Sequence, residues 1–131
     1  MSAELIAASL LNVAGVTNLV GTRRALGVLP QNCAMPALVY SVVDTTPIIT
    51  MNAIAGPQLL QSRIQVTALA ATPAGVEQIL AAVMAAMNLK SGTFATKAVA
   101  WTIRDIKSPL TRDNEAGLWY CSQDFVAHWY E

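Results

Sequence analysis

The sequence predicts an α+β domain in which a mainly antiparallel sheet of about four strands carries two helices packed on one face, in the order α-β-β-α-β-β. Four segments have the short alternating or continuous apolar pattern of strands, and two have apolar residues at every third or fourth position, as helices do. Neither an internal repeat nor a low-complexity linker separates these segments. We therefore expect a single domain, since 131 residues can bury a core of their own.

The first helix is expected to begin at Ser2, a capping residue, with Glu4 in the first turn, where the helix dipole favours an acid. Apolar residues recur at helical spacing as far as Gly15, which is expected to end the helix. Residues 16–20 are expected to add a short turn. Residues 22–35 are rich in turn-forming residues, and this composition predicts a loop that can include one short strand.

Residues 37–44 and 62–69 predict two strands that pair as antiparallel neighbours. The first has apolar side chains on both faces, which indicates a central, covered strand. The second alternates cleanly: Ile64, Val66 and Ala68 are expected to face inward, and Arg63, Gln65 and Thr67 outward.

The connection between these strands, residues 45–61, is unusually apolar. Two interpretations remain open and can hold together: strand extensions that pair as a long hairpin, or an apolar arm that docks on a neighbouring subunit. An apolar hairpin tip that stayed exposed would be prone to aggregation. The residues expected to make the subunit contact are Ile48, Ile49, Met51 and Ile54.

Thr72 and Pro73 predict the start of the second helix, because a capping hydroxyl followed by proline suits the first helical turn. The helix is expected over residues 74–87. One apolar stripe runs along it, formed by Val76, Ile79, Leu80, Val83, Met84 and Met87. The stripe is expected to pack on the sheet.

Residues 97–106 and 118–130 predict the last two strands, with a polar turn at 107–117 between them. In the first of these strands, Val99, Trp101 and Ile103 are expected on one face, opposite Ala98, Ala100 and Thr102. In the second, one face is expected to carry Trp119, Cys121, Phe125, Ala127 and Trp129, and the other Ser122, Asp124 and His128.

The composition favours an assembly component. Hydrophobic residues make up 54% of the chain and charged residues only 12%, so we expect apolar surface to enter an oligomeric interface. The net charge is zero and no basic stripe occurs, which argues against direct nucleic-acid binding. No segment has the run of about 20 apolar residues that a membrane span needs, and the first residues lack the basic character of a secretory signal. Synthesis in the cytoplasm is expected.

No pattern in the sequence predicts an enzyme. The single histidine, His128, has no nucleophile pattern near it, and the glycines are too scattered for a phosphate-binding loop. His, Cys, Asp and Glu do not cluster at metal-ligand spacing, so neither a metal nor another cofactor is expected. Cys33 and Cys121 are interpreted as free thiols.

Two charged pairs are further candidates for subunit or partner contacts. Arg23 and Arg24 form the only doublet of like charge, and they are interpreted either as part of a solvated loop or as a contact with an acidic rim on a neighbouring subunit. Arg112 and Asp113 lie in the polar turn and are weaker candidates.

The ordered set of segments resembles the tail completion, or tail terminator, proteins of long-tailed bacteriophages and prophages. The resemblance rests on Leu29-Pro30-Gln31, Met35-Pro36-Ala37-Leu38-Val39-Tyr40, Ser62-Arg63-Ile64-Gln65-Val66 and the closing Asp124-Phe125-Val126. It implies one terminator-like domain over residues 1–131. It also implies a hexameric ring at the head-proximal end of the tail tube, which stops tube growth and offers a surface for head joining.

The resemblance further implies a tail tube protein and a head–tail connector protein as partners, with the protein located in the virion tail and, during assembly, in the host cytoplasm. Two other interpretations remain open. One is a different neck or connector component. The other is a small cytoplasmic oligomeric α+β module that binds a ligand, which would need convergent polar groups in an apolar pocket.

Overall fold

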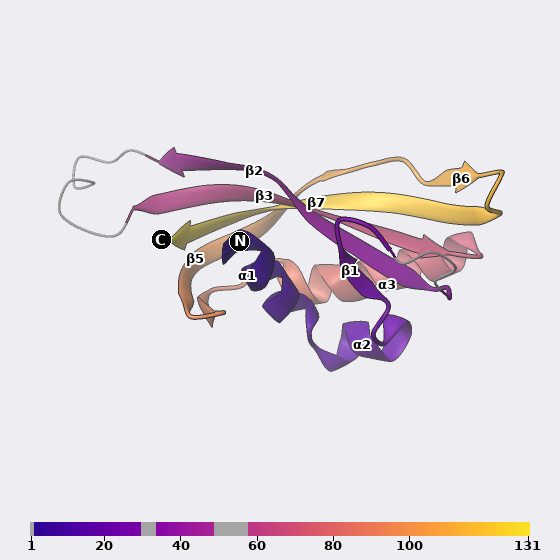
Figure 1. Ribbon diagram of the computed structural model, residues 1–131, viewed down its shortest axis with the longest axis horizontal. Helices are drawn as coiled ribbons and strands as arrows, with labels where there is room; N and C mark the ends of the chain where they lie inside the picture. The colour runs from indigo at the N-terminus through magenta and orange to yellow at the C-terminus, as the bar shows by residue number, and fades with distance from the viewer. Residues whose placement is uncertain (1, 30–33, 49–57) are drawn as a thin grey trace.

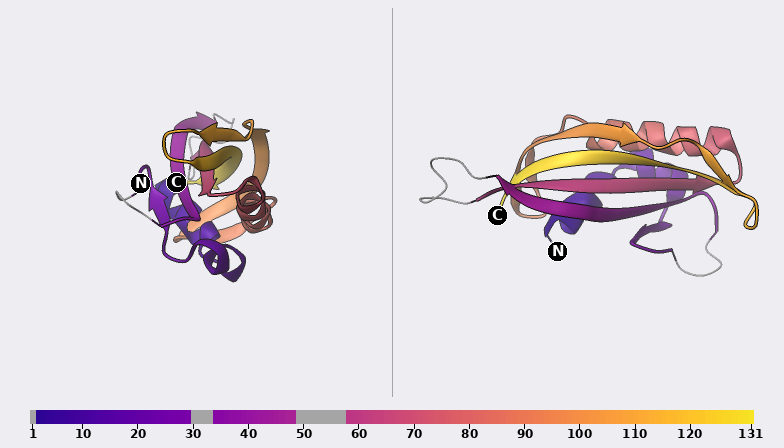
Figure 2. Two further views of the ribbon diagram at one scale, coloured as in Figure 1. Left: turned by 90° about the vertical axis from the view of Figure 1, so that its right-hand side faces the viewer. Right: turned by 90° about the horizontal axis from the view of Figure 1, so that it is seen from above.

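A seven-stranded mixed sheet, curled into a half-barrel, carries three helices on one side (Figure 1). The computed structural model describes residues 2–29, 34–48 and 58–131. The strands lie in the order β1-β2-β3-β7-β5-β4, and β6 pairs with β7. Helices α1 and α3 contact the strands, whereas α2 packs on α3. The long strands run side by side along the length of the molecule (Figure 2).

The helices are α1 (Ser2–Leu11), α2 (Ala14–Val20) and α3 (Pro73–Met87). The strands are β1 (Arg24–Leu26), β2 (Ala37–Ile48), β3 (Leu59–Ala70), β4 (Gly92–Phe94), β5 (Lys97–Lys107), β6 (Thr111–Asp113) and β7 (Leu118–Tyr130). Among the described helices, no single one is long and apolar enough to cross a membrane, and α1 and α2, which reach that length together, are bent by 83°.

The predicted fold class, an α+β sheet of about four antiparallel strands with two helices on one face, is wrong. The four long strands β2, β3, β5 and β7 correspond to the predicted ones, but β1, β4 and β6 join them. Strand β1 pairs with β2 in parallel, which makes the sheet mixed. Each added strand has three residues, too few for alternation to be visible in the sequence. Gly15, expected to end the first helix, lies inside a separate helix, α2.

The centre of the sheet follows the predicted pattern. Strands β3 and β7 pair in antiparallel register, with Ile64 opposite Phe125, and both side chains are fully buried on the side of the helices. The alternation predicted for β3 is confirmed, as is its antiparallel pairing with β2. Helix α3 begins as expected, because the Thr72 hydroxyl accepts a hydrogen bond from the Gly75 amide at 3.1 Å.

Strand β2 is not the central, covered strand that its two apolar faces predicted. Strand β1 covers only Leu38 to Tyr40, and no described strand pairs with the outer side of β2 beyond that point. Residues 43–47 are exposed. A bulge lies between Val42 and Asp44, and Pro47 removes a backbone donor, two features that make this edge a poor template for pairing with another strand.

Strand β5 differs from its prediction because of another bulge. Val99 pairs with Trp129, but the register shifts before Trp101, which pairs with His128. The extra residue turns Trp101 and Ile103 to the outer face, and Thr102 points toward the helices beside Val99. The predicted grouping of Val99 with Trp101 and Ile103 is therefore wrong.

Candidate interaction surface

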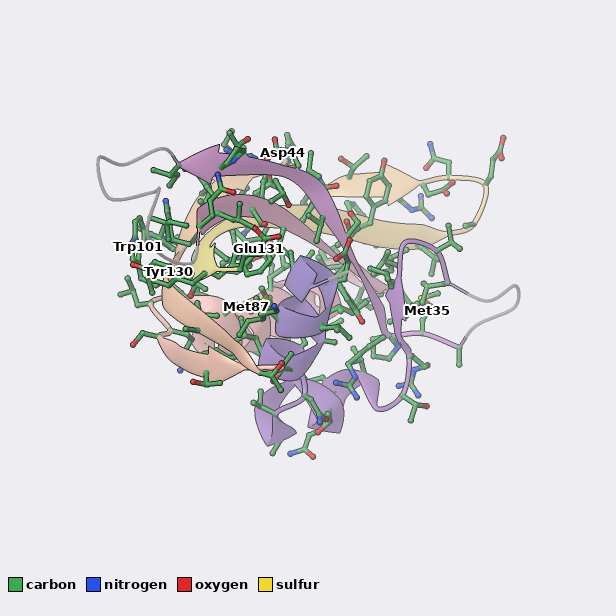
Figure 3. The ribbon with its side chains drawn as sticks, turned by 60° about the vertical axis from the view of Figure 1, so that its left-hand side comes forward. Met35, Asp44, Met87, Trp101, Tyr130 and Glu131 are labelled. Carbon is green, nitrogen blue, oxygen red and sulfur yellow. The ribbon has the colours of Figure 1, made fainter. Side chains whose placement is uncertain are left out.

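An apolar patch covers the face of the sheet turned away from the helices, at the end where β2 and β3 approach the 49–57 segment. We call it the outer patch; it consists of Trp101, Ile103, Val126, His128 and Tyr130. Trp101 is 43% exposed, Ile103 39% and Tyr130 41%, while Val126 is buried beside them. Figure 3 shows Trp101 and Tyr130 at the same end of the sheet as Glu131. Large apolar side chains gathered in this way mark an interaction surface.

The rings of Trp101 and His128 stack, with centroids 4.0 Å apart and planes inclined by 17°. Burial lowers the pKa of His128, because removing water disfavours the charged imidazolium. Its Nδ1 atom is buried and has no hydrogen-bond partner among the described residues. The imidazole therefore behaves as a neutral flat ring, and the outer patch carries no charge at neutral pH.

A charged cluster borders the outer patch. The Arg63 guanidinium forms ion pairs with the carboxylates of Asp105 and Asp124, the latter at 3.3 Å. The hydrogen bond to Asp105 contributes most to raising the pKa of Arg63, against the opposing effect of burial. Two carboxylates share one cation, so the border has a net negative charge. These partly exposed ion pairs add little to the stability of the fold. They mark the boundary at which the apolar surface ends and a charged surface begins.

The two arginines predicted to contact a neighbour are held within their own chain. Arg23 Nε donates to the Pro36 carbonyl at 2.7 Å. Arg24 donates from Nε to the Gly21 carbonyl at 3.0 Å and from Nη1 to the Leu11 carbonyl at 3.1 Å. Both side chains therefore fasten the loop around β1 to the rest of the domain.

Of the other predicted contact residues, those that the structure describes lie at opposite ends of the sheet. Arg112 and Asp113 are exposed in β6, at the opposite end of the sheet from the end of β2 (Figure 1). Ile48 is the half-buried last residue of β2. Ile49, Met51 and Ile54 lie outside the described residues. The predicted residues within the described part of the chain therefore do not form one site.

A second feature is a groove of about 460 Å³ between α3 and β5. Several of its polar groups contact neighbours: Lys107 Nζ contacts Glu77 at 3.0 Å, and Gln123 Nε2 donates to the Asp105 carbonyl at 3.1 Å. Within the described part of the chain, no group of three or more His, Cys, Asp and Glu residues is placed to hold a metal ion.

The Cys121 thiol donates to the Ser108 carbonyl at 3.0 Å, and burial raises the pKa of this thiol.

Comparison with known proteins identifies the family. The sequence profile of the family described as "Tail completion protein gp17" matches residues 4–130. The chain belongs to this family. It is therefore a structural protein of a phage tail, and the resemblance inferred from the ordered segments is confirmed.

Solved structures share the fold of this tail completion protein. A chain of the "Virion of native gene transfer agent (GTA) particle" superposes with a TM-score of 0.73 and 16% identical residues, over 98% of this chain and 97% of its own. A second solved protein gives a TM-score of 0.61, also with 16% identity, over 100% of this chain and 96% of its own. No curated protein sequence matches the chain significantly.

Proposed function

We propose that this tail completion protein closes the head-proximal end of the tail tube as a ring of identical subunits. The ring stops the addition of tube subunits and presents the surface to which the head is joined. Membership of the tail completion family, over residues 4–130, is the observation that carries the proposal. The similar fold of a chain in a gene transfer agent virion supports a place in such a particle.

The physical basis is a contact between two different surfaces of one subunit. Such head-to-tail contacts close into a ring when the rotation between neighbours divides a full turn, and the family resemblance implies six copies. The edge of β2 is blunted by its bulge and by Pro47, which favours side-chain contacts over continuous strand pairing between subunits. The low content of charged residues, 12%, suits a chain that buries apolar surface in an assembly.

The two ends of the subunit suit different partners. The outer patch is apolar, and so are the side chains of Ile48, Ile49, Met51 and Ile54; both groups suit permanent contacts between subunits. Arg112 and Asp113, exposed at the opposite end, suit a polar contact with the tail tube protein or the head–tail connector protein. Arg23 and Arg24 would contribute to assembly indirectly, by holding the loop around β1 in position.

Growth of tail tubes tests the proposal. Purified tube protein is polymerised with and without this protein, and tube lengths and ends are recorded by negative-stain electron microscopy. We expect the protein to shorten the tubes in proportion to its concentration and to add density at one end only. Tubes of unchanged length with bare ends would contradict the proposal.

A further inference from the structure

We infer that the outer patch of one subunit is the docking site for the 49–57 segment of the next subunit. The inference rests on the proposed ring and names the surface that receives the apolar arm. Its basis is the chemistry of the patch, the composition of the segment, and the positions at which the chain leaves and re-enters the sheet.

The side chains of the outer patch suit contact with an uncharged apolar partner. Trp101 and Ile103 stand on β5, and His128 and Tyr130 stand on the adjacent β7, so their side chains form one surface. Trp101, Ile103 and Tyr130 are each about two-fifths exposed. Covering such surface stabilises a complex by about 25 cal/mol for each Å² removed from water. The charged cluster of Arg63, Asp105 and Asp124 limits the patch on one side.

The 49–57 segment has the matching composition. Its nine residues include Ile49, Met51 and Ile54 and carry no charged side chain. A flexible methionine adapts well to aromatic surfaces such as Trp101, because sulfur–ring contacts are favourable over a range of geometries. An uncharged segment meets an uncharged patch without the cost of burying an unpaired charge.

The register of the sheet favours a second copy as the source of the segment. Ile48 pairs with Leu59, Leu59 with Tyr130, and Ile103 with Val126, so Ile48 and Ile103 are three strands and four residues apart. With about 4.8 Å between strands and about 3.3 Å per residue, that separation is about 20 Å.

The backbone distance from Ile48 to Ile103 is longer than an outward path within the same chain can span. Toward its end at Ile48, strand β2 runs in the direction that leads away from Ile103. The nine residues 49–57 connect Ile48 to Gln58, so only about half of them are available for the outward path. An outward path of four or five residues spans about 15 Å at most. The segment of a neighbouring subunit has no such tether. Because segment and patch are different surfaces, each contact leaves another segment and another patch free until the ring closes.

Disulfide cross-linking between single-cysteine variants tests this contact. In a background with Cys33→Ser and Cys121→Ser, Met51→Cys on one tagged chain is mixed with Ile103→Cys on a differently tagged chain and oxidised. A covalent pair carrying both tags can form only between subunits. The matched control replaces Ile103→Cys by Val28→Cys, at a side chain that is 80% exposed and lies outside the patch.

We expect at least about tenfold more cross-linked pair than in the control, because a docked segment raises the effective concentration of the two thiols. The double variant Met51→Cys with Ile103→Cys is expected to give a ladder of covalent oligomers. A ring, seen by light scattering, that gives no cross-link above the control would overturn the docking inference and leave the proposed function standing. An internal cross-link alone would also overturn it. Cross-linked dimers that never cap tubes would support the docking contact and contradict the proposed ring.

Discussion

Hydrogen bonds around the buried Ser62 hydroxyl hold the end of the sheet that carries the outer patch. The indole N–H of Trp129 donates to the Ser62 hydroxyl at 2.9 Å, and this hydroxyl lies 2.9 Å from that of Thr45. Ser62 is fully buried, so the indole has no water to replace this partner. The contact joins β3 to β7 and reaches β2 close to the place where the apolar arm begins.

We predict that Ser62→Ala lowers the free energy of unfolding by about 1–3 kcal/mol, the usual cost of leaving a buried donor unpaired. Urea unfolding followed by tryptophan fluorescence measures the change. Ser122→Ala serves as the control, because Ser122 shares its hydroxyl contact with Thr67 on the half-buried outer face. Equal decreases in the free energy of unfolding in the two variants would mean that the buried indole hydrogen bond contributes no more than the hydroxyl contact of Ser122.

His128 gives the outer patch a dependence on pH. Burial lowers the pKa of His128, so the unfolded chain takes up a proton more readily than the folded protein. This contribution to stability is present above the ordinary histidine pKa of about 6.5 and is lost as the pH falls through that value toward the lower pKa of the folded state.

We therefore predict that the urea midpoint falls between pH 7.5 and pH 5.5, and that His128→Phe reduces this fall. Phenylalanine keeps a flat ring against Trp101 but cannot take up a proton. The two proteins are compared by urea unfolding at both pH values. An identical fall in the variant would show that other groups are responsible.

At the scale of the elements, Thr102 fastens the end of α3 to β5. Its hydroxyl donates to the Met87 carbonyl and accepts from the Lys90 amide at 2.9 Å, and the residue is fully buried. The backbone of Thr102 also pairs with Leu89 and Lys90. Thr102 comes directly after Trp101, so this junction positions the strand that carries half of the outer patch.

We predict that Thr102→Val, which keeps the shape but removes the hydroxyl, destabilises the fold by about 1–3 kcal/mol. Hydrogen exchange should increase most at Leu89, Lys90 and the adjoining part of β5, since their contacts are loosened. Thr93→Val, at an exposed residue of β4, is the control. Loss of protection spread evenly over the sheet would contradict a local role for Thr102.

Helices and strands long enough to repeat their hydrophobic pattern several times could be predicted from the sequence. Strand β3 alternates from Ser62 to Ala70, and α3 has a capping residue, a proline and a continuous apolar stripe. Strands β4 and β6 could not be predicted, and β1 was expected only as one short strand somewhere in residues 22–35. Three residues contain no complete pattern, and the pairing of these strands depends on neighbours distant in sequence. Helix α2 was missed for a similar reason, since it has only seven residues and includes Gly15.

The candidate site was predictable only in part. The outward position of His128 followed from the alternation in β7, and the apolar character of the arm followed from its composition. The positions of Trp101 and Ile103 did not follow, because a bulge reverses the alternation and leaves no mark in the sequence. The hydrogen bonds of Arg23 and Arg24 depend on backbone carbonyls whose positions are set by the folded chain.

At the scale of the whole molecule, the two candidate contact regions lie at opposite ends of the long sheet. The outer patch and the start of the arm lie at one end, and the exposed β6 residues lie at the other (Figure 1). Under the proposed function, the subunit would join its neighbours at the first end and a different tail protein at the second.

We predict that Ile49→Asp combined with Met51→Asp leaves a folded monomer that neither assembles nor caps tubes, because charges in an apolar contact lose their hydration. Circular dichroism and light scattering report fold and mass. The matched control, Val28→Asp with Leu89→Asp, places two acids at side chains that are 80% and 71% exposed. If the arm variant unfolds while the control does not, the arm belongs to the core of the subunit.

The most direct test of the proposed ring is the mass of the purified protein in solution, measured by light scattering with and without uncapped tail tubes. We predict either a closed ring of about six subunits in solution or a monomer that forms such a ring on tube ends. A monomer or dimer that ignores the tubes would contradict the account.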